Sequence, residues 1–187
     1  MKGNKVQKFM QLGGQEVAVE LDMRDERTRK LGAQLLLTEV LEYVIKGLQV
    51  TPIIKGTKVE DPNDVQFEVN GEPDAVEMLD GLADVAYTMY WNALAFGLPL
   101  EEGFDLVCDN NLEKFVQLEG WTSAPGPVEQ GKWDCGEGAE WPEEVAHVEV
   151  IKIDEEHFAV GKDSTGKVRK PVSFRSVQLS HLVAGGN

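Results

Sequence analysis

The stretch LLLTEVLEYVI, residues 35–45, decides the fold that we predict for this chain. Wound as a helix, it is apolar on nearly every side, and a helix of that kind is normally buried. Its only charged residues are Glu39 and Glu42, which lie three positions apart and therefore on one helix face. No lysine or arginine lies within the stretch to pair with them. The pattern predicts a buried helix, over about residues 25–48, that holds two uncompensated carboxylates.

The stretch from Met78 to Phe96 predicts a second helix with the same anomaly. Its only charged residues are Asp80 and Asp84, and Glu77 precedes it by one position. Like charges at these offsets destabilise a helix by roughly 0.2–0.5 kcal/mol per pair in water, and burial raises that cost unless a counterion is bound. We expect the two helices to run antiparallel, so that their carboxylates face one another and form a cage of oxygen atoms.

A cage of carboxylate oxygens suits a hard divalent cation, Mg²⁺ in the first place and Mn²⁺ as an alternative. The competing interpretation is that these side chains form a solvated polar stripe and bind nothing. A carboxylate di-iron bundle would need Glu-x-x-His motifs, and no histidine occurs before His147. An EF-hand is excluded as well, because no stretch has the spacing of its calcium loop.

The rest of the sequence predicts further helices and a small region of strands. Residues 65–69 and the alternating apolar residues 148–160 favour strands, whereas residues 120–146, rich in Gly, Pro, Glu and Trp, favour an irregular insertion. The predicted fold class is all-α, with a four- to five-helix core over residues 1–118. An irregular insertion and a β-hairpin tail, residues 119–187, would pack on that core. Helices are expected over residues 5–12, 25–48, 73–97 and 99–118, and proline at the start and glycine past the end support the third of them.

The charge of the chain limits its partners. It carries 33 acidic and 18 basic side chains, for a net charge of −15. Such a field repels nucleic-acid polymers and anionic membranes, so neither is an expected partner. Asp84 and Asn92 interrupt the longest apolar run, and the polar start at Met1 shows no signal peptide. We expect a cytoplasmic protein, either cellular or made by a virus in the cytoplasm of its host.

Four segments resemble, in order, the motifs of the MazG-like superfamily of all-α nucleoside triphosphate pyrophosphohydrolases. The first segment, LLLTEVLE (35–42), is similar to a Leu-rich helix that carries the motif E-E-x-x-E. The second segment, EMLDGLADVAY (77–87), is similar to the partner motif E-x-x-D. The last two are similar to the N-x-x-K and G-K-x-x-K segments of the branch labelled Cof-like or phosphoribosyl-ATP pyrophosphohydrolase-like. The chain departs from the first motif at Thr38, where the superfamily has an acidic residue. The segments are LLLTEVLE (35–42), EMLDGLADVAY (77–87), NNLEKF (110–115) and GKVRKPV (166–172).

The resemblance implies a hydrolase that cleaves a (deoxy)nucleoside triphosphate between its α and β phosphates, giving (d)NMP and pyrophosphate. Such an activity would serve control of the dNTP pool or supply of a monophosphate. The resemblance also implies a homodimer or homotetramer, in which Asn111 and Lys114 touch the substrate. Either Glu39 or Glu42 would act as general base. Carried over by position, the Mg²⁺ ligands are Glu39, Glu42, Glu77, Asp80 and Asp84.

Other side chains are candidate substrate contacts on chemical grounds. Tyr87 lies in an aromatic part of the second helix and either stacks on a base or belongs to the core. Lys167, Arg169 and Lys170 form a basic group in an acidic chain, which either holds phosphates or lies on a solvated hairpin. Two other functions stay open: a non-catalytic nucleotide-binding module that lost a metal ligand at Thr38, and a helical scaffold.

Overall fold

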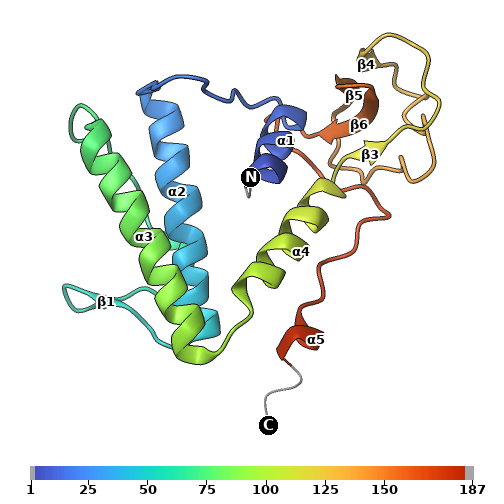
Figure 1. The fold of residues 1–187 in the computed structure, drawn as a ribbon. Helices are drawn as coiled ribbons and strands as arrows, with labels where there is room; N and C mark the ends of the chain where they lie inside the picture. The colour runs from blue at the N-terminus through green and yellow to red at the C-terminus, as the bar shows by residue number, and fades with distance from the viewer. Residues whose placement is uncertain (1–2, 184–187) are drawn as a thin grey trace. The chain divides into compact units, whose positions relative to one another are not determined.

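The computed structural model describes residues 3–183, which form two compact units (Figure 1). The helix-pair unit comprises residues 20–85. The sheet unit comprises the residues up to 19 together with those from 86 onward. Each unit therefore has its own packing and its own candidate residues.

The sheet unit is built on four antiparallel strands in the order β3-β6-β5-β4. The long hairpin of β5 and β6 forms its centre, and the short strands β3 and β4 form its edges (Figure 1). Three helices accompany the sheet. The elements are α1 (Asn4–Leu12), α4 (Leu100–Leu112), β3 (Val116–Gln117), β4 (Gly126–Val128), β5 (His147–Ile153), β6 (Glu156–Lys162) and α5 (Ser180–Val183).

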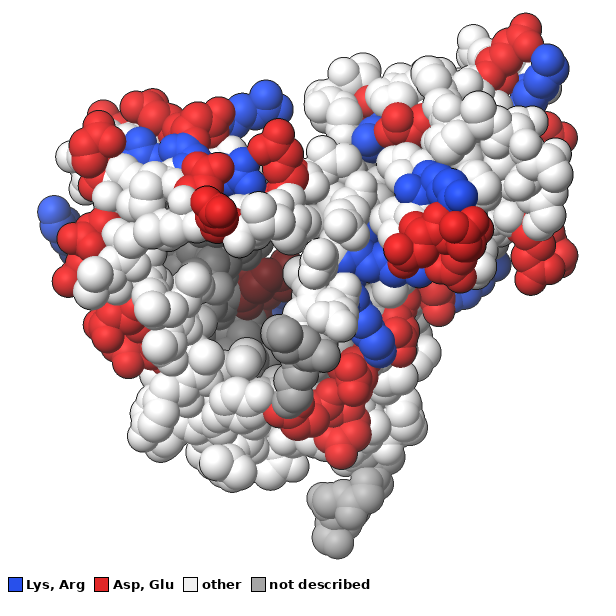
Figure 2. Space-filling model, turned by 45° about the horizontal axis from the view of Figure 1, so that its top comes forward, with Lys and Arg blue, Asp and Glu red and all other residues white. Residues whose placement is uncertain are grey.

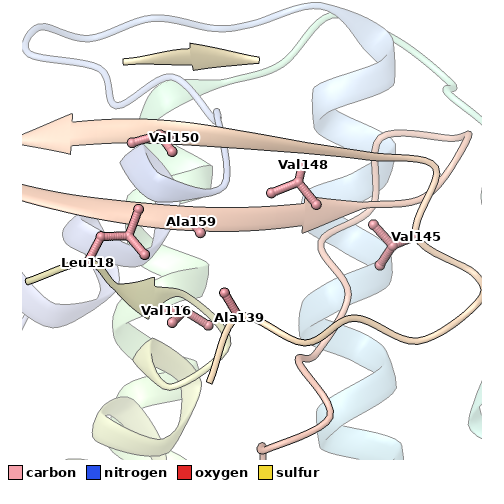
Figure 3. Packing of buried hydrophobic residues seen from close by; sticks show 7 residues of the cluster. All are labelled: Val116, Leu118, Ala139, Val145, Val148, Val150 and Ala159. Carbon is pink, nitrogen blue, oxygen red and sulfur yellow. The ribbon is translucent and has the colours of Figure 1, made fainter. Parts of the chain in front are cut away.

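Both faces of this sheet are covered by apolar side chains. Val148, Val150 and Ala159 project on one face and pack with residues of β3 and of the loops, as Figure 3 shows. Phe158 and Val160 join a second cluster, which includes Leu12 and Phe115 from the helices. A strand buried on both faces lacks strict alternation of polar and apolar residues, which explains the run of buried residues in β6. Three tryptophans pack against the first cluster from residues 119–146: Trp121, Trp133 and Trp141.

The helix-pair unit contains α2 and the first half of α3, which continues beyond Val85 into the sheet unit, and each of these two long helices begins at an aspartate cap. Asp25 Oδ1 accepts a hydrogen bond from the backbone N–H of Thr28 at 2.8 Å, and Asp74 Oδ1 accepts one from Val76 at the same distance. A two-stranded hairpin lies in the connection between the helices. The elements are α2 (Glu26–Glu42), η1 (Tyr43–Gly47), β1 (Ile53–Ile54), β2 (Thr57–Lys58), η2 (Pro62–Asp64) and α3 (Ala75–Phe96).

Helices α2 and α3 run in the same direction (Figure 1). The guanidinium of Arg29, near the start of α2, donates to the carbonyl of Gly71, just before α3, at 3.0 Å. The prediction of antiparallel helices is therefore wrong. The connecting residues 48–74 return along the pair before α3 begins, whereas a short turn would have reversed the direction.

The prediction of an all-α fold is wrong, because the structure is 40% helical and 13% strand, with two antiparallel sheets. The helix expected to reach residue 118 ends at Leu112, and Val116–Gln117 instead pair with β6. The strand expected over residues 65–69 is absent from the described chain. By contrast, the helices expected over 5–12, 25–48 and 73–97 and the strands near 148–160 are confirmed.

The prediction that the helix over residues 25–48 is buried is also wrong. Leu35 is 56% exposed and Leu36 is 41% exposed, whereas Leu41 is buried. Because α2 carries apolar residues on nearly every side, one neighbouring helix can cover only part of its apolar surface. In the described part of the chain, no helix has the length and apolar character needed to cross a bilayer.

Candidate functional site

The two carboxylates of α2 differ in their surroundings. Glu39 is exposed, and Glu42 is half-buried. The ammonium of Lys46 lies 2.9 Å from Glu42 Oε1, one helical turn further along the chain. Glu42 therefore has a counterion just beyond the stretch whose composition predicted none.

The three carboxylates of α3 are exposed. Asp80 and Asp84 are one turn apart, and an offset of three then leads to Tyr87 on the same side of the helix. Tyr87 is 71% exposed, so the alternative that it belongs to the core is wrong. Among residues 3–183, neither Glu39 nor any carboxylate of α3 takes part in an ion pair.

The predicted cage of five carboxylates does not form within one copy of the chain. No three acidic, histidine or cysteine side chains between residues 3 and 183 lie close enough together to hold a metal ion. All residues of α3 from Val76 to Asp84 are exposed, and so is Glu39 in α2. Water therefore hydrates these carboxylates and removes the cost of burial. Figure 2 shows acidic side chains spread over the face that it draws.

The sheet unit brings together the two residues predicted from the N-x-x-K segment. The ammonium of Lys114 donates to Asn111 Oδ1 at 2.6 Å. The same ammonium lies 5.3 Å from the centroid of the Phe9 ring, within range of a cation–π contact. Asn111 lies in the last turn of α4 and Lys114 just beyond it, so the end of this helix presents an amide and a positive charge together.

The lysines of the tail lie in the loop that follows β6. Lys167 is exposed, and Lys170 places its ammonium 4.5 Å from the centroid of the Phe174 ring. Neither lysine forms an ion pair in the described part of the chain. Arg169 differs, because its guanidinium contacts Asp163 Oδ2 at 2.8 Å. Two cations of the predicted basic group, Lys167 and Lys170, thus remain available to an anion.

Asp163 organises this loop, although the sequence analysis did not single it out. Its Oδ1 accepts from the Thr165 hydroxyl at 2.7 Å and from the backbone N–H of Lys167 at 3.0 Å. Its Oδ2 accepts from Arg169 Nε at 2.9 Å. The Thr165 hydroxyl, followed by these backbone and guanidinium contacts, lowers the pKa of Asp163 from 3.8 to about 2. An aspartate followed two residues later by threonine and then glycine is a local signal for such a turn.

The two cysteines are free thiols in the sheet unit. Cys108 is buried in α4, and Cys135 is half-buried in the loop before β5. Burial raises the pKa of both thiols, and a neutral thiol is a poor nucleophile and a poor metal ligand.

A shallow hollow of about 430 Å³ lies at one end of the sheet. Residues 117–121 and 155–157 line it, and they include Trp121 and His157. None of the residues predicted for substrate or metal lies in this lining. The hollow therefore adds no predicted residue to the candidate site.

The chain matches no protein-family model, and no curated protein or solved structure shows significant similarity to it. The resemblance to MazG-like enzymes thus stays a prediction that rests on the four sequence segments.

Proposed function

We propose that the chain is a Mg²⁺-dependent (deoxy)nucleoside triphosphate pyrophosphohydrolase that releases a monophosphate and pyrophosphate. One observation carries the proposal: helices α2 and α3 present exposed carboxylates, at Glu39, Glu77, Asp80 and Asp84, that form no ion pair within the described residues. Carboxylate oxygens are the donors that a divalent cation and a bound triphosphate require. The order of the four sequence segments supports the same chemistry.

The proposed ligands fit Mg²⁺ by donor chemistry, although one copy of the chain does not gather three of them. When bound, the cation would neutralise phosphate oxygens and acidify a water molecule. Either Glu39 or Glu42 would act as general base, and Glu39 is the one that forms no ion pair in the described chain, whereas Glu42 Oε1 contacts the Lys46 ammonium at 2.9 Å. The remaining proposed ligands are Glu42, Glu77, Asp80 and Asp84.

The residues of the sheet unit would supply positive charge to the phosphates. Lys114 would bind a phosphate oxygen while Asn111 holds its ammonium in place. Lys167 and Lys170 would add two further cations, since neither is paired with a carboxylate in the described chain. Tyr87, exposed on the same side of α3 as Asp84, would stack on the base.

The proposal includes the cellular location and the oligomeric state of the protein. We propose a cytoplasmic enzyme, cellular or viral, because its substrate is found in that compartment. As the resemblance implies, the enzyme would act as a homodimer or homotetramer on dNTPs, either to control the pool or to supply a monophosphate. Nucleic-acid polymers and membranes are not proposed partners, because the net charge of −15 repels both.

A second candidate is a non-catalytic nucleotide-binding module. It is favoured by the dispersed carboxylates and by Thr38, which stands where the superfamily has an acidic residue. Such a module would keep the lysines that bind phosphate without assembling the ligands needed for hydrolysis. It would bind a nucleotide and release no pyrophosphate.

The test is pyrophosphate release from a panel of purine and pyrimidine dNTPs with Mg²⁺. The proposal predicts turnover of at least one dNTP, lost on removal of Mg²⁺ with a chelator. Glu42→Gln and Asp80→Asn should each lower kcat at least about 100-fold with unchanged helical circular dichroism, whereas the control Glu68→Gln should not. Nucleotide-induced stabilisation without turnover would replace the enzyme by the binding module. No response to nucleotide or metal would refute both.

A further inference from the structure

The chain turns back on itself directly after β6. Lys162 and Val168 form an antiparallel bridge, and the backbone N–H of Arg169 donates to the carbonyl of Gly161 at 2.8 Å. In an antiparallel pair, residues that stand opposite each other project their side chains to the same face. Residues 161–169, the tail hairpin, therefore have a fixed register that determines which side chains share a face.

Two cations share the solvent face of the tail hairpin. Successive side chains of an extended chain alternate between the two faces. Val168 packs against the second apolar cluster, so its neighbours Lys167 and Arg169 project from the opposite face. Lys167 is exposed, and the side chain of Arg169 is 38% exposed. An offset of two separates their Cα atoms by about 7 Å, so both side chains can reach one small ligand.

Asp163 lies on the same hairpin and is the one charged residue that is buried in the described chain, with 7% of its surface exposed. Its Oδ1 accepts three hydrogen bonds that hold the turn, from the N–H and hydroxyl of Thr165 and from the N–H of Lys167. Its Oδ2 takes no part in the turn and accepts only from the guanidinium of Arg169. One buried carboxylate oxygen thus serves to orient a single cation.

The contact with Asp163 uses one edge of the Arg169 guanidinium. Nε and Nη2 lie 2.9 Å and 2.8 Å from Asp163 Oδ2. Nη1 and the second N–H of Nη2 have no partner in the part of the chain that the structure describes. These N–H groups form the other edge of a planar fork, which matches two oxygens of a phosphoryl group. Because the carboxylate fixes the first edge, the free edge has a set direction before any ligand binds.

The charge around this fork favours an anion. Residues 162–170 contain four basic side chains and one acidic side chain, in a chain that carries 18 basic and 33 acidic side chains in total. The ammonium of Lys162 is paired with Glu149 at 2.6 Å, and the other cations of the segment exceed the single charge of Asp163. The acidic remainder of the chain repels a polyanion, so a small phosphoryl group suits this surface better than a nucleic acid.

We propose that Lys167 and Arg169 form a clamp for one phosphoryl group and that Asp163 is the residue that positions Arg169 in it. The Arg169 fork would contact two phosphoryl oxygens, and the Lys167 ammonium would contact a third. This deepens the proposed function and rests on it for the nature of the ligand, a phosphate-bearing nucleotide. The clamp itself requires no metal ion and no hydrolysis.

The experiment is calorimetric titration of the full chain with inorganic pyrophosphate, at low salt and with a chelator in place of Mg²⁺. The wild type should bind pyrophosphate, and Arg169→Lys should raise the dissociation constant at least about tenfold, because an ammonium held by Asp163 offers no second edge. Lys167→Gln should raise it by a similar factor. The control Lys152→Gln removes the same charge from another exposed hairpin residue of the sheet unit and should change it less than about twofold.

The role of Asp163 is tested by coupling. Asp163→Asn keeps an oxygen for the turn but turns an amide N–H₂ toward the guanidinium, so it should raise the dissociation constant at least about tenfold. In the Arg169→Lys background, the same change should have less than about a twofold further effect, because Asp163 acts through Arg169. Circular dichroism at the titration temperature checks that each variant is folded.

The outcomes separate the clamp from the proposed enzyme. A wild type that does not bind pyrophosphate, or an Arg169→Lys variant that binds it as tightly as the wild type, would overturn the clamp. Equal effects of Asp163→Asn in both backgrounds would show that Asp163 only stabilises the fold. Pyrophosphate binding with these dependences, in a chain that turns over no dNTP, would retain the clamp and remove the enzyme.

Discussion

The two units of this protein place their apolar residues in very different surroundings. In the sheet unit, Leu12, Ala159 and Val160 are 0% exposed, and both faces of the central hairpin are covered. In the helix-pair unit, by contrast, Leu79 is 72% exposed on a helix with ample apolar surface. This difference shows that an apolar sequence pattern predicts which surface must be buried. It does not predict which residues bury that surface.

The largest expected effect is the loss of stability that follows truncation of a core side chain in the sheet unit. Phe158→Ala should lower the free energy of unfolding by about 3–5 kcal/mol, because Phe158 is buried in the second cluster. Leu82→Ala, in a residue of α3 that is 57% exposed, should lower it by less than about 1 kcal/mol. Urea unfolding followed by circular dichroism measures both changes. Equal losses would contradict the comparison.

Alanine substitutions at two glycines are expected to change the free energy of unfolding by smaller amounts, and with opposite signs in the two units. A Cβ on Gly161 would collide with the indole ring of Trp141, so Gly161→Ala should destabilise the sheet unit by about 1–3 kcal/mol. A Cβ on Gly81, inside α3, would meet no atom within 4 Å. Gly81→Ala should therefore stabilise its helix by about 0.5–1 kcal/mol. Thermal unfolding checks the two signs, and a shared sign would show that the units pack alike.

The smallest effect concerns pH and the Asp163 turn. Because the pKa of Asp163 in the folded chain lies below 3.8, its ionised form stabilises the sheet unit above that pH. This contribution is lost as the pH falls through 3.8 toward about 2. Asp163→Asn should thus have a lower Tm than the wild type at pH 7, and the difference should shrink as the pH approaches 2. A pH-independent difference would mean that ionisation of Asp163 does not hold the turn.

Local patterns in the sequence were sufficient for much of the secondary structure. The apolar period of residues 5–12 and the alternation at residues 148–160 correctly predicted α1 and the β5–β6 hairpin. The β1–β2 hairpin was missed because its turn residues, Lys55 and Gly56, lack the usual Asn-Gly signal. The end of α4 was misplaced because Val116 continues an apolar helical spacing, although it pairs with β6.

The candidate site was harder to predict than the elements that carry it. Periodicity correctly places Asp80 and Asp84 on one side of α3, but it does not tell which side faces inward. The direction of α3 relative to α2 depends on residues 48–74, which contain no strong local signal. The Asn111–Lys114 contact was within reach of sequence reasoning, because an offset of three at a helix end is a local relation.

Hydrogen exchange of the full chain, measured at low and high protein concentration, tests most directly the proposal that the chain acts as a homo-oligomer, in which a second copy covers the exposed apolar residues of the helix pair. We predict that amides of α2, α3 and the β1–β2 hairpin gain protection as concentration rises, whereas protection of β5 and β6 stays constant. Protection of α2 and α3 that equals that of β5 and β6 and does not depend on concentration would contradict the account.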